Sequence, residues 1–324
     1  NIYENIHNLK DEIYDSKDLK NLSNKIQPLE KEITIFHADV VNKIVKEFKS
    51  NIDFVGFHGQ TIFHNAKEKI SKQLGDGELL SKLIKKTVVY DFRQNDLKNG
   101  GHGAPLTPIF HKLLKVKFKI KDVTFVNIGG IVNVTTILDD DKISGTDIGP
   151  GMCLIDKWVR ENSKENYDEN GIVAKSGKVN KIALNQLLEN FRTKEKISRT
   201  GVIQSFDTKY FDFSFVRDLS FEDGAATLTE FTAQIIISAL KVTERNKEKI
   251  ILCGGGRKNN FLFEKLKKEI SHIKLIDEYR IDGDFVESQA FAYLAIRSYL
   301  NLPISFPTTT GVDKPCSGGI INRI

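Results

Sequence analysis

The sequence predicts an α/β protein built from two domains, for three reasons. The chain has 324 residues, and domains of about 100–200 residues favour two domains over one. Short apolar runs typical of strands recur along the chain, and each stops at polar or glycine residues. Stretches with helical periodicity lie between them. Two domains imply a cleft, and the ends of strands are where the ligands of sheet enzymes gather.

Composition excludes several classes of protein. With 40% apolar and 28% charged residues, the chain is neither disordered nor fibrous. The 48 basic and 43 acidic residues give a net charge of +5, and the lysines are scattered among acids, which argues against a nucleic-acid surface. No apolar stretch approaches the roughly 18–20 residues of a membrane span. Cys153, Cys253 and Cys316 are odd in number and far apart, so they favour a reducing cytoplasm over a disulfide framework.

The first fifty residues are predicted to be helical. A strand at 52–57 follows and ends in His58 to Thr61, and a second strand at 87–90 ends in a charged stretch, 91–96, and a glycine-rich one, 100–105. In the helical part, apolar residues at three-to-four spacing predict one face that packs into the core: Ile33, Phe36, Val40, Ile44, Val45 and Phe48.

A lysine-rich connector at 112–121 separates the two predicted domains. We place the first domain at 1–118, joined by 305–324, and the second at 119–304. The second domain opens with a β-hairpin signature at 123–138. Its remaining elements are expected to be a helix at 154–160, a buried helix at 225–241, a strand at 250–253 and a helix at 260–270.

Three glycine bends, at 129–130, 149–151 and 254–256, follow a strand or open a helix. Glycine lets backbone N–H groups approach an anion closely, although each bend alone is also typical of an ordinary turn. Two standard nucleotide motifs are excluded. Residues 171–178 have five rather than four residues between their glycines, with Val179 where Ser or Thr should stand, and the triple glycine lacks Gly-x-Gly-x-x-Gly spacing.

Four histidines and three carboxylates are the chemically interesting side chains. The spacing of the histidines matches no zinc template, so we predict no metal site formed by side chains; His58 and His102 are interpreted as hydrogen-bond partners of a substrate, and His64 and His111 as structural. Among the carboxylates, the best placed general bases are Asp147 and Asp91, with Glu287 third. For Glu287, an acid favoured by the helix dipole is an equal alternative.

Taken together, these segments resemble the anhydro-N-acetylmuramic acid kinases, a bacterial cell-wall recycling family, over nearly the full length. The resembling stretches are GFHGQTIFH at 56–64, QLGDGELL at 73–80, VVYDFRQNDLKNGGHGAPLTPIFH at 88–111, VNIGGIVNVTTI at 126–137, GTDIGPGMCLIDKWV at 145–159, SFDTKYF at 205–211, CGGGRKNNFLFEKL at 253–266 and ESQAFAYLAIRSYLNLPISFPTTTG at 287–311.

The resemblance implies the two-domain, actin-like (RNase H-like) sugar kinase fold, in which two α/β domains close over ATP. It also implies the reaction: ATP, water and 1,6-anhydro-N-acetylmuramic acid give the 6-phosphate sugar, with Mg²⁺ bridging the phosphates. By the same resemblance, ATP contacts a phosphate-facing turn, an adenosine-facing turn and neighbouring amides: Asn127, Gly129, Gly130, Asn133, Gly254, Gly255, Gly256 and Asn259.

The resemblance assigns Asp147 as the base that takes a proton from the water attacking C1, and Glu287 as a second acidic residue near that water. Cleavage of the anhydro bridge then frees O6 to take the γ-phosphoryl group. The sugar pocket is expected to contain His58, Gln60, Asp91, Arg93 and Gly149.

Three departures from the family pattern are visible. Members open with a strand and a Met-Ser-Gly-Thr-Ser-x-Asp-Gly-like phosphate loop, whereas this chain starts at Asn1 without such a segment. We therefore expect a truncated first domain that lacks its first strands. Met152 replaces a usual Asn, and His102 a usual Gln. The alternatives are a truncated, impaired relative that binds the sugar without efficient phosphoryl transfer, and a kinase of another sugar or of a carboxylate. The expected partners are the amino sugar and ATP, without nucleic acid or membrane, and a homodimer is compatible with the sequence.

Overall fold

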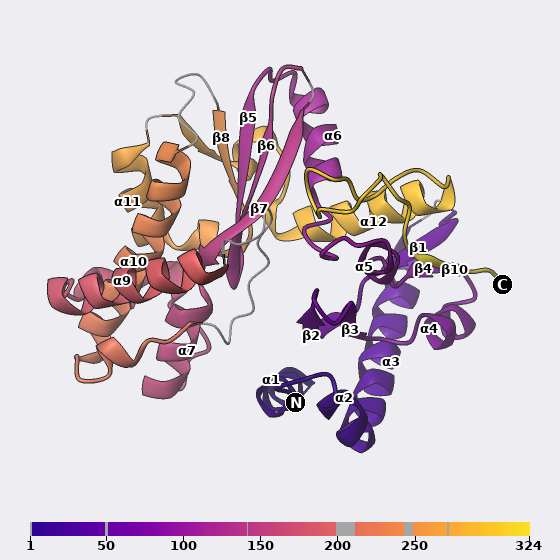
Figure 1. The fold of residues 1–324 in the computed structure, drawn as a ribbon. Helices are drawn as coiled ribbons and strands as arrows, with labels where there is room; N and C mark the ends of the chain where they lie inside the picture. The colour runs from indigo at the N-terminus through magenta and orange to yellow at the C-terminus, as the bar shows by residue number, and fades with distance from the viewer. Residues whose placement is uncertain (1, 49–50, 141, 199–210, 243–248, 271) are drawn as a thin grey trace. The chain divides into compact units, whose positions relative to one another are not determined.

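The computed structural model describes residues 2–48, 51–140, 142–198, 211–242, 249–270 and 272–324 (Figure 1). The chain divides into two compact units: unit 1 is Asn1–Phe110 with Ser288–Ile324, and unit 2 is His111–Glu287. Strands and helices alternate in both, so the predicted α/β class is confirmed. The division lies at 110/111 and 287/288, whereas the sequence analysis placed it at 118/119 and 304/305.

The unit boundary lies at 287/288 rather than at 304/305 because of the way the last long helix packs. Helix α12 (Val286–Tyr299) presents Phe291, Leu294 and Ala295 to a core cluster that also contains Val89 and Phe92 from unit 1. Since a helix joins the unit against which it buries its apolar face, α12 belongs with unit 1 from Ser288 onward.

Unit 1 is built around a small mixed sheet in the order β1-β4-β10, in which β1 and β4 are parallel and β10 is antiparallel to β4. A separate hairpin, β2–β3, follows β1. The elements are α1 (Ile2–Glu12), α2 (Asp18–Asn21), α3 (Ser23–Glu47), β1 (Phe54–Phe57), β2 (Gln60–Asn65), β3 (Ile70–Leu74), α4 (Gly77–Ile84), β4 (Thr87–Tyr90), α5 (Gln94–Lys98), the start of α6 (Pro108–Phe118), most of α12, and β10 (Ile320–Asn322).

The predicted core face of the long N-terminal helix is wrong in its second half. Helix α3 buries Ile33, but the side chains of Phe36, Val40, Ile44 and Phe48 are 54%, 38%, 42% and 61% exposed, and Val45 is half-buried. The helix contacts two clusters on different sides. Ile33 packs with Leu9, Ile62 and Leu74, whereas Ala38 packs with Phe57, Leu80 and Ile84. At about 100° per residue, Ile33 and Ala38 point about 140° apart, so no single stripe is buried throughout.

Unit 2 contains a five-stranded sheet in the order β7-β6-β5-β8-β9. Strands β5, β8 and β9 are parallel, and β6 is antiparallel to both neighbours. The elements are the rest of α6, β5 (Val123–Ile128), β6 (Ile131–Ile137), β7 (Ile143–Pro150), α7 (Cys153–Asn162), η1 (Glu169–Gly171), α8 (Ile172–Ser176), α9 (Lys181–Ser198), η3 (Ser214–Val216), α10 (Phe221–Val242), β8 (Lys249–Cys253), η4 (Gly255–Lys258), α11 (Asn260–Glu269), β9 (Ile273–Leu275), η5 (Ile276–Tyr279) and η6 (Gly283–Phe285).

Helices cover both faces of this sheet (Figure 1). On one face, Val126 and Val132 pack with Trp158 of α7 and Leu228 of α10 in the main core of the unit. On the other face lies α6, whose buried His111 stacks on Phe125 of β5 with ring centroids 4.6 Å apart. The His111 Nδ1 is also 2.9 Å from Thr135 Oγ1 on β6. The face covered by α6 is the one that carries the polar residues described next.

Candidate active site

A row of polar side chains crosses the sheet of unit 2 where β5 ends. Asn127 on β5 is paired with Asn133 on β6, and Asn133 is paired with Asp147 on β7. Residues directly opposite each other on neighbouring strands point to the same face, with Cβ atoms about 4.5–5.5 Å apart. All three are partly exposed. Phe125 and Thr135, each two residues away along β5 and β6 on the same face, are buried. The fold therefore brings Asp147, Asn133 and Asn127 together at an accessible end of a buried sheet.

A β-bulge lies next to Asp147. Asn133 is paired with Asp147 but its neighbour Val132 is paired with Gly149, so Ile148 is the extra residue on β7. Bulges bend a strand and change the direction in which nearby side chains point, and they are common beside active sites. The bulge separates Asp147 from Gly149, whose φ is +147°. A Cβ on Gly149 would lie 2.9 Å from Phe191 and 3.0 Å from Ile235, so this predicted sugar contact lies against core residues.

The Gly129–Gly130 bend is held by the residues that open α7. The backbone N–H groups of Gly151 and Met152 donate to the carbonyls of Gly130 and Gly129, both over 2.9 Å. A Cβ on Gly151 would lie 2.3 Å from the Gly129 oxygen, so only glycine allows this approach. The predicted phosphate turn is therefore a fixed part of the β5–β6 hairpin, beside the polar row.

The Gly254–Gly256 turn lies against the same hairpin. Gly254 has a φ of +80°, and a Cβ there would lie 2.6 Å from the Asn127 Oδ1. Gly256 lies against the side chain of Ile128, whereas a Cβ on Gly255 would meet nothing within 4 Å. The turn is therefore packed against the hairpin at Gly254 and Gly256 and open at Gly255. A ligand can contact the backbone of a glycine turn directly from such an open side.

Two amide atoms in this part of unit 2 are buried without a hydrogen-bond partner among the described residues: the Asn133 Oδ1 and the Asn259 Nδ2. Asn259 already has a structural task, because its Oδ1 accepts from the Leu262 N–H over 2.9 Å and begins α11. A buried polar atom without a partner is costly, so Asn133 in particular fits a ligand that supplies a donor or a cation.

Mg²⁺ is compatible with this donor set. Across the part of the chain that the structure describes, no three His, Cys, Asp or Glu side chains gather into a metal site. Mg²⁺ bound with a nucleotide takes only one or two carboxylates and otherwise phosphate and water oxygens. The Asn133 Oδ1 can contact such an ion, and Asp147 on the paired strand adds negative charge nearby.

Unit 1 brings a second group of predicted residues together at the ends of β1 and β4. Arg93 Nε donates to His58 Nε2 over 3.0 Å, and Arg93 Nη1 donates to the Gly103 carbonyl over 2.7 Å. The His58 Nδ1 lies 2.8 Å from the carbonyl oxygen of Gly59, so Nδ1 carries the proton and Nε2 accepts. Its ring packs on Phe291, with centroids 4.1 Å apart. His58 therefore orients Arg93.

The other two predicted sugar residues of unit 1 lie beside this pair in the chain. Asp91 follows β4 with a φ of +55°, and burial raises the pKa of its carboxyl above the ordinary value. Gln60 is exposed at the start of β2. A Cβ on Gly59 would lie 2.3 Å from the Leu74 oxygen, which fixes the sharp turn between His58 and Gln60.

The sequence analysis assigned no role to Asp96 and Thr310, which fix the glycine-rich loop after α5. The buried Asp96 carboxylate accepts from the Gly103 N–H and from the Thr310 hydroxyl, each over 2.6 Å. The His102 N–H donates to the Thr310 carbonyl over 2.8 Å. Asp96 belongs to the charged stretch 91–96 noted in the sequence, but its role could not be predicted because its partner Thr310 is 214 residues away.

Glu287 is exposed in the first turn of α12. It follows η6 directly, and the Asp282 side chain begins η6 by accepting from the Asp284 N–H over 3.0 Å. Glu287 therefore has the exposure that either predicted role requires.

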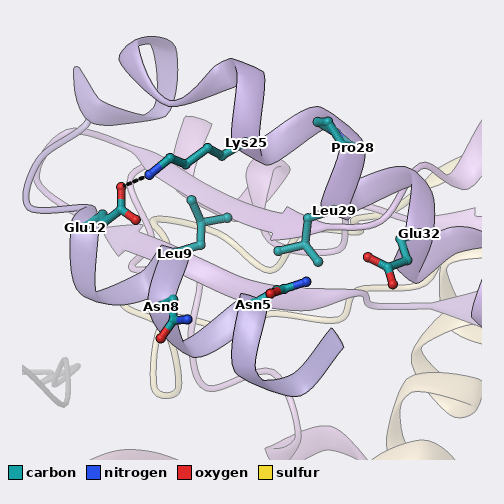
Figure 2. Close-up of a pocket in the computed structure, with 8 residues that line it drawn as sticks. All are labelled: Asn5, Asn8, Leu9, Glu12, Lys25, Pro28, Leu29 and Glu32. Atoms are coloured by element: carbon teal, nitrogen blue, oxygen red, sulfur yellow. Dashed lines mark hydrogen bonds and ion pairs between the residues drawn. The ribbon is translucent and has the colours of Figure 1, made fainter. Parts of the chain in front are cut away.

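A pocket of about 320 Å³ lies elsewhere, between α1 and α3 of unit 1 (Figure 2). Its walls carry an exposed ion pair, Lys25 Nζ to Glu12 Oε2 at 2.5 Å. The lining residues are Asn5, Asn8, Leu9, Glu12, Lys25, Pro28, Leu29 and Glu32, none of which belongs to the predicted site. The polar residues that line it are all exposed, so this hollow offers no buried polar atom comparable with the Asn133 Oδ1 of the polar row.

Comparison with known proteins decides the family. A family model described as anhydro-N-acetylmuramic acid kinase matches residues 3–323. The chain belongs to the anhydro-N-acetylmuramic acid kinase family. It is thus a kinase, and the family predicted from its sequence motifs is confirmed.

Curated bacterial relatives agree. The chain is 51% identical over 330 residues to an anhydro-N-acetylmuramic acid kinase of Pelagibacter ubique, covering 99% of this chain and 87% of that protein. It is 36% identical to the one from Brucella canis, covering 96% and 86%, and 38% identical to the one from Rhizobium etli, covering 94% and 83%.

Similar solved structures are more distant. One is an activator of 2-hydroxyisocaproyl-CoA dehydratase from Clostridium difficile with bound ADPNP, at 17% identity and a TM-score of 0.35, covering 56% of this chain and 64% of that one. At that TM-score the similarity is too low for any conclusion about this chain. Among the described helices of this family member, none is both long and apolar enough to cross a bilayer.

The buried His111 and the half-buried His58 predict loss of stability in acid. Burial lowers the pKa of His111 from 6.5 to about 3, and burial with the nearby Arg93 charge lowers the pKa of His58 likewise to about 3. Because these pKa values lie below those of the unfolded chain, the unfolded state binds the extra protons. The free energy of unfolding should fall from pH 6.5 towards pH 3, by about 1.4 kcal/mol per pH unit for each histidine.

Urea unfolding of the wild type and of His111→Gln, at several pH values in the upper part of that window, measures the effect. The variant should lose roughly half of the histidine-dependent slope. An identical slope in both proteins would show that His111 is not held neutral in the folded state.

Proposed function

We propose that this kinase opens 1,6-anhydro-N-acetylmuramic acid with water and transfers the γ-phosphoryl group of ATP to O6. The product is N-acetylmuramic acid 6-phosphate, and the role is in cell-wall recycling. The observation that carries the proposal is the row Asp147, Asn133 and Asn127 beside the Gly254–Gly256 turn. In this row a candidate general base lies near an open glycine turn. Hydrolytic ring opening needs the base, and phosphoryl transfer needs a nucleotide-binding turn nearby.

Asp147 is the proposed general base. The water oxygen forms a bond to C1 while the bond from C1 to the bridging O6 breaks, and Asp147 takes a proton from the water. The freed O6 then forms a bond to the γ-phosphorus as ADP leaves. A base must be fixed within reach of its proton, and pairing with Asn133 between β6 and β7 supports such fixing.

The nucleotide is assigned to the two glycine turns of unit 2. The Gly129–Gly130 turn would face the phosphates, and the open side of Gly255 would face the adenosine. Mg²⁺ supplies neutralisation of the charge on the phosphates. The Asn133 Oδ1 is buried without a partner among the described residues. It would accept a hydrogen bond from the nucleotide or from its bound water, or contact the cation.

The sugar is assigned to the residues at the ends of β1 and β4. Arg93 would be its cationic contact, held by His58 and by the Gly103 carbonyl. Gln60, Asp91 and the acid Glu287 complete the proposed set. None of the three cysteines forms a disulfide. The cytoplasmic location and the homodimer stay predictions.

The proposal is tested with protein expressed from its complete reading frame, incubated with ATP, Mg²⁺ and 1,6-anhydro-N-acetylmuramic acid in H₂¹⁸O. Mass spectrometry should find the 6-phosphate sugar with ¹⁸O at C1. Product incubated alone in the labelled water controls for exchange at the hemiacetal. Unlabelled product would rule out attack by water at C1.

Other results would favour the alternatives. Phosphorylation of an open sugar but not of the anhydro sugar would identify a kinase of a different substrate. Sugar binding by calorimetry without any product, with ATP in excess, would identify an impaired relative. Either outcome would overturn the proposed reaction.

A further inference from the structure

Arg257 is the most extensively bonded buried cation in the described part of unit 2, and neither the family resemblance nor the comparisons assign it a role. It lies in η4, directly after the Gly254–Gly256 turn, and its side chain is only 4% exposed. Burying a guanidinium is costly unless it is paired and hydrogen-bonded. The contacts of Arg257 show how that cost is offset.

The guanidinium bonds three separate parts of the chain. To Asp277 of η5, Nε donates over 2.7 Å and Nη2 over 3.0 Å, a two-point ion pair. Nη1 donates to Asp284 Oδ1 of η6 over 3.0 Å and to the Gly254 carbonyl over 3.1 Å. Arg257 thus ties its own glycine turn to two carboxylates that follow β9.

The segment that carries these carboxylates is fitted closely to the guanidinium. A Cβ on Gly283 would lie 2.1 Å from Arg257 Nε, so only glycine lets the backbone approach the guanidinium this closely. The Gly283 N–H also donates to Asp277 Oδ1 over 3.2 Å. The hydrogen bonds from Arg257 lower the pKa of Asp277 from its ordinary value. Hydrogen bonds from Lys258 and then Arg257 lower the pKa of Asp284, so both carboxyls remain ionised partners at neutral pH.

The position of this segment in the chain gives the cluster a functional consequence. Three residues after Asp284 comes Glu287, in the first turn of α12. A single buried side chain therefore connects the turn assigned to adenosine with the segment that leads to the second acid. Displacement of a reacting group by about 1 Å can cost roughly 100-fold in rate, so such a connection would matter for catalysis.

We propose that Arg257 is a positioning residue, which sets the Gly254–Gly256 turn relative to Glu287 through Asp277 and Asp284. The role rests on the proposed function, because the turn and Glu287 take their tasks from it. Arg257 itself need not touch substrate. Lysine could not replace it, since an ammonium cannot make the two-point contact with Asp277 while also reaching Asp284 and Gly254.

The test compares wild type, Arg257→Ala and Arg257→Lys. Lys274→Ala is the matched control, because it removes a neighbouring exposed cation paired with Glu278 at 3.6 Å. Both Arg257 variants should lower kcat/KM for ATP by about 100-fold, with little change in KM for the sugar, whereas the control should match wild type. Added guanidinium, well below denaturing concentration, should restore part of the activity of Arg257→Ala only.

Hydrogen–deuterium exchange without nucleotide separates this role from the proposed function. Peptides covering 254–259 and 276–287 should both exchange faster in Arg257→Ala, even if the substrate assignment were wrong. Faster exchange with unchanged kinetics, or a loss of melting temperature without guanidinium rescue, would reduce Arg257 to a structural ion pair. Unchanged exchange in both peptides would overturn the connection itself. An inactive wild type would reject the proposed function, while the exchange data would still report on the connection.

Discussion

Replacing Asp147 with asparagine is expected to lower turnover by about 10²–10⁴-fold, the usual contribution of a general base. The amide keeps the size of the carboxylate but cannot take the proton from water. The residue is partly exposed and lies in a sheet whose pairing uses backbone groups, so melting temperature should change little. Initial rates of product formation at saturating ATP and anhydro sugar measure the effect.

The matched control is Asp140→Asn, an exposed acid between β6 and β7 that pairs with Lys142 at 2.6 Å. It should turn over at the wild-type rate. Near-normal turnover of Asp147→Asn would remove the proposed base, and a collapse in melting temperature would indicate a structural role instead.

The second large effect is expected at Glu287. Glu287→Ala should reduce turnover by about 100-fold or more if the carboxylate acts near the attacking water. An acid that only complements the helix dipole contributes about 0.3–1 kcal/mol of stability and nothing to the rate. Turnover and melting temperature measured on the same preparation therefore separate the two interpretations.

Glu222 provides the control, because it is also an exposed acid in the first turn of a helix, α10. Glu222→Ala should show the modest dipole effect on melting temperature and no change in turnover. If Glu287→Ala behaves in the same way as Glu222→Ala, Glu287 is a helix-capping charge and leaves the proposed mechanism.

Much of the fold was predictable because its signals are local. The hairpin around Gly129–Gly130 and the buried helix at 225–241 are set by glycine at a bend and by apolar periodicity, and both are found in the structure. The prediction that Phe36, Val40 and Ile44 pack into the core was wrong because it, too, used only a local signal. Periodicity reveals that a helix has an apolar side, but not which neighbours will cover it.

The candidate site divides in the same way. Residue type and strand-end position singled out Asp147, and the family resemblance added Asn127 and Asn133. That these three stand opposite one another depends on strand register and on the bulge at Ile148, which join residues from three strands. Asp96 with Thr310, and Arg257 with Asp277, went unnoticed because the members of each pair, 214 and 20 residues apart, meet only when the chain folds.

The sequence by itself determined the α/β class, the family and the chemical types of the candidate residues, since these depend on local patterns and ordered motifs. Only the tertiary structure decided that α12 packs with unit 1, that His58 is a neutral acceptor for Arg93, and that Arg257 is buried among carboxylates. Burial and hydrogen bonding set the charge state of His58 and the partners of Arg257, and both arise only when segments far apart in sequence pack together.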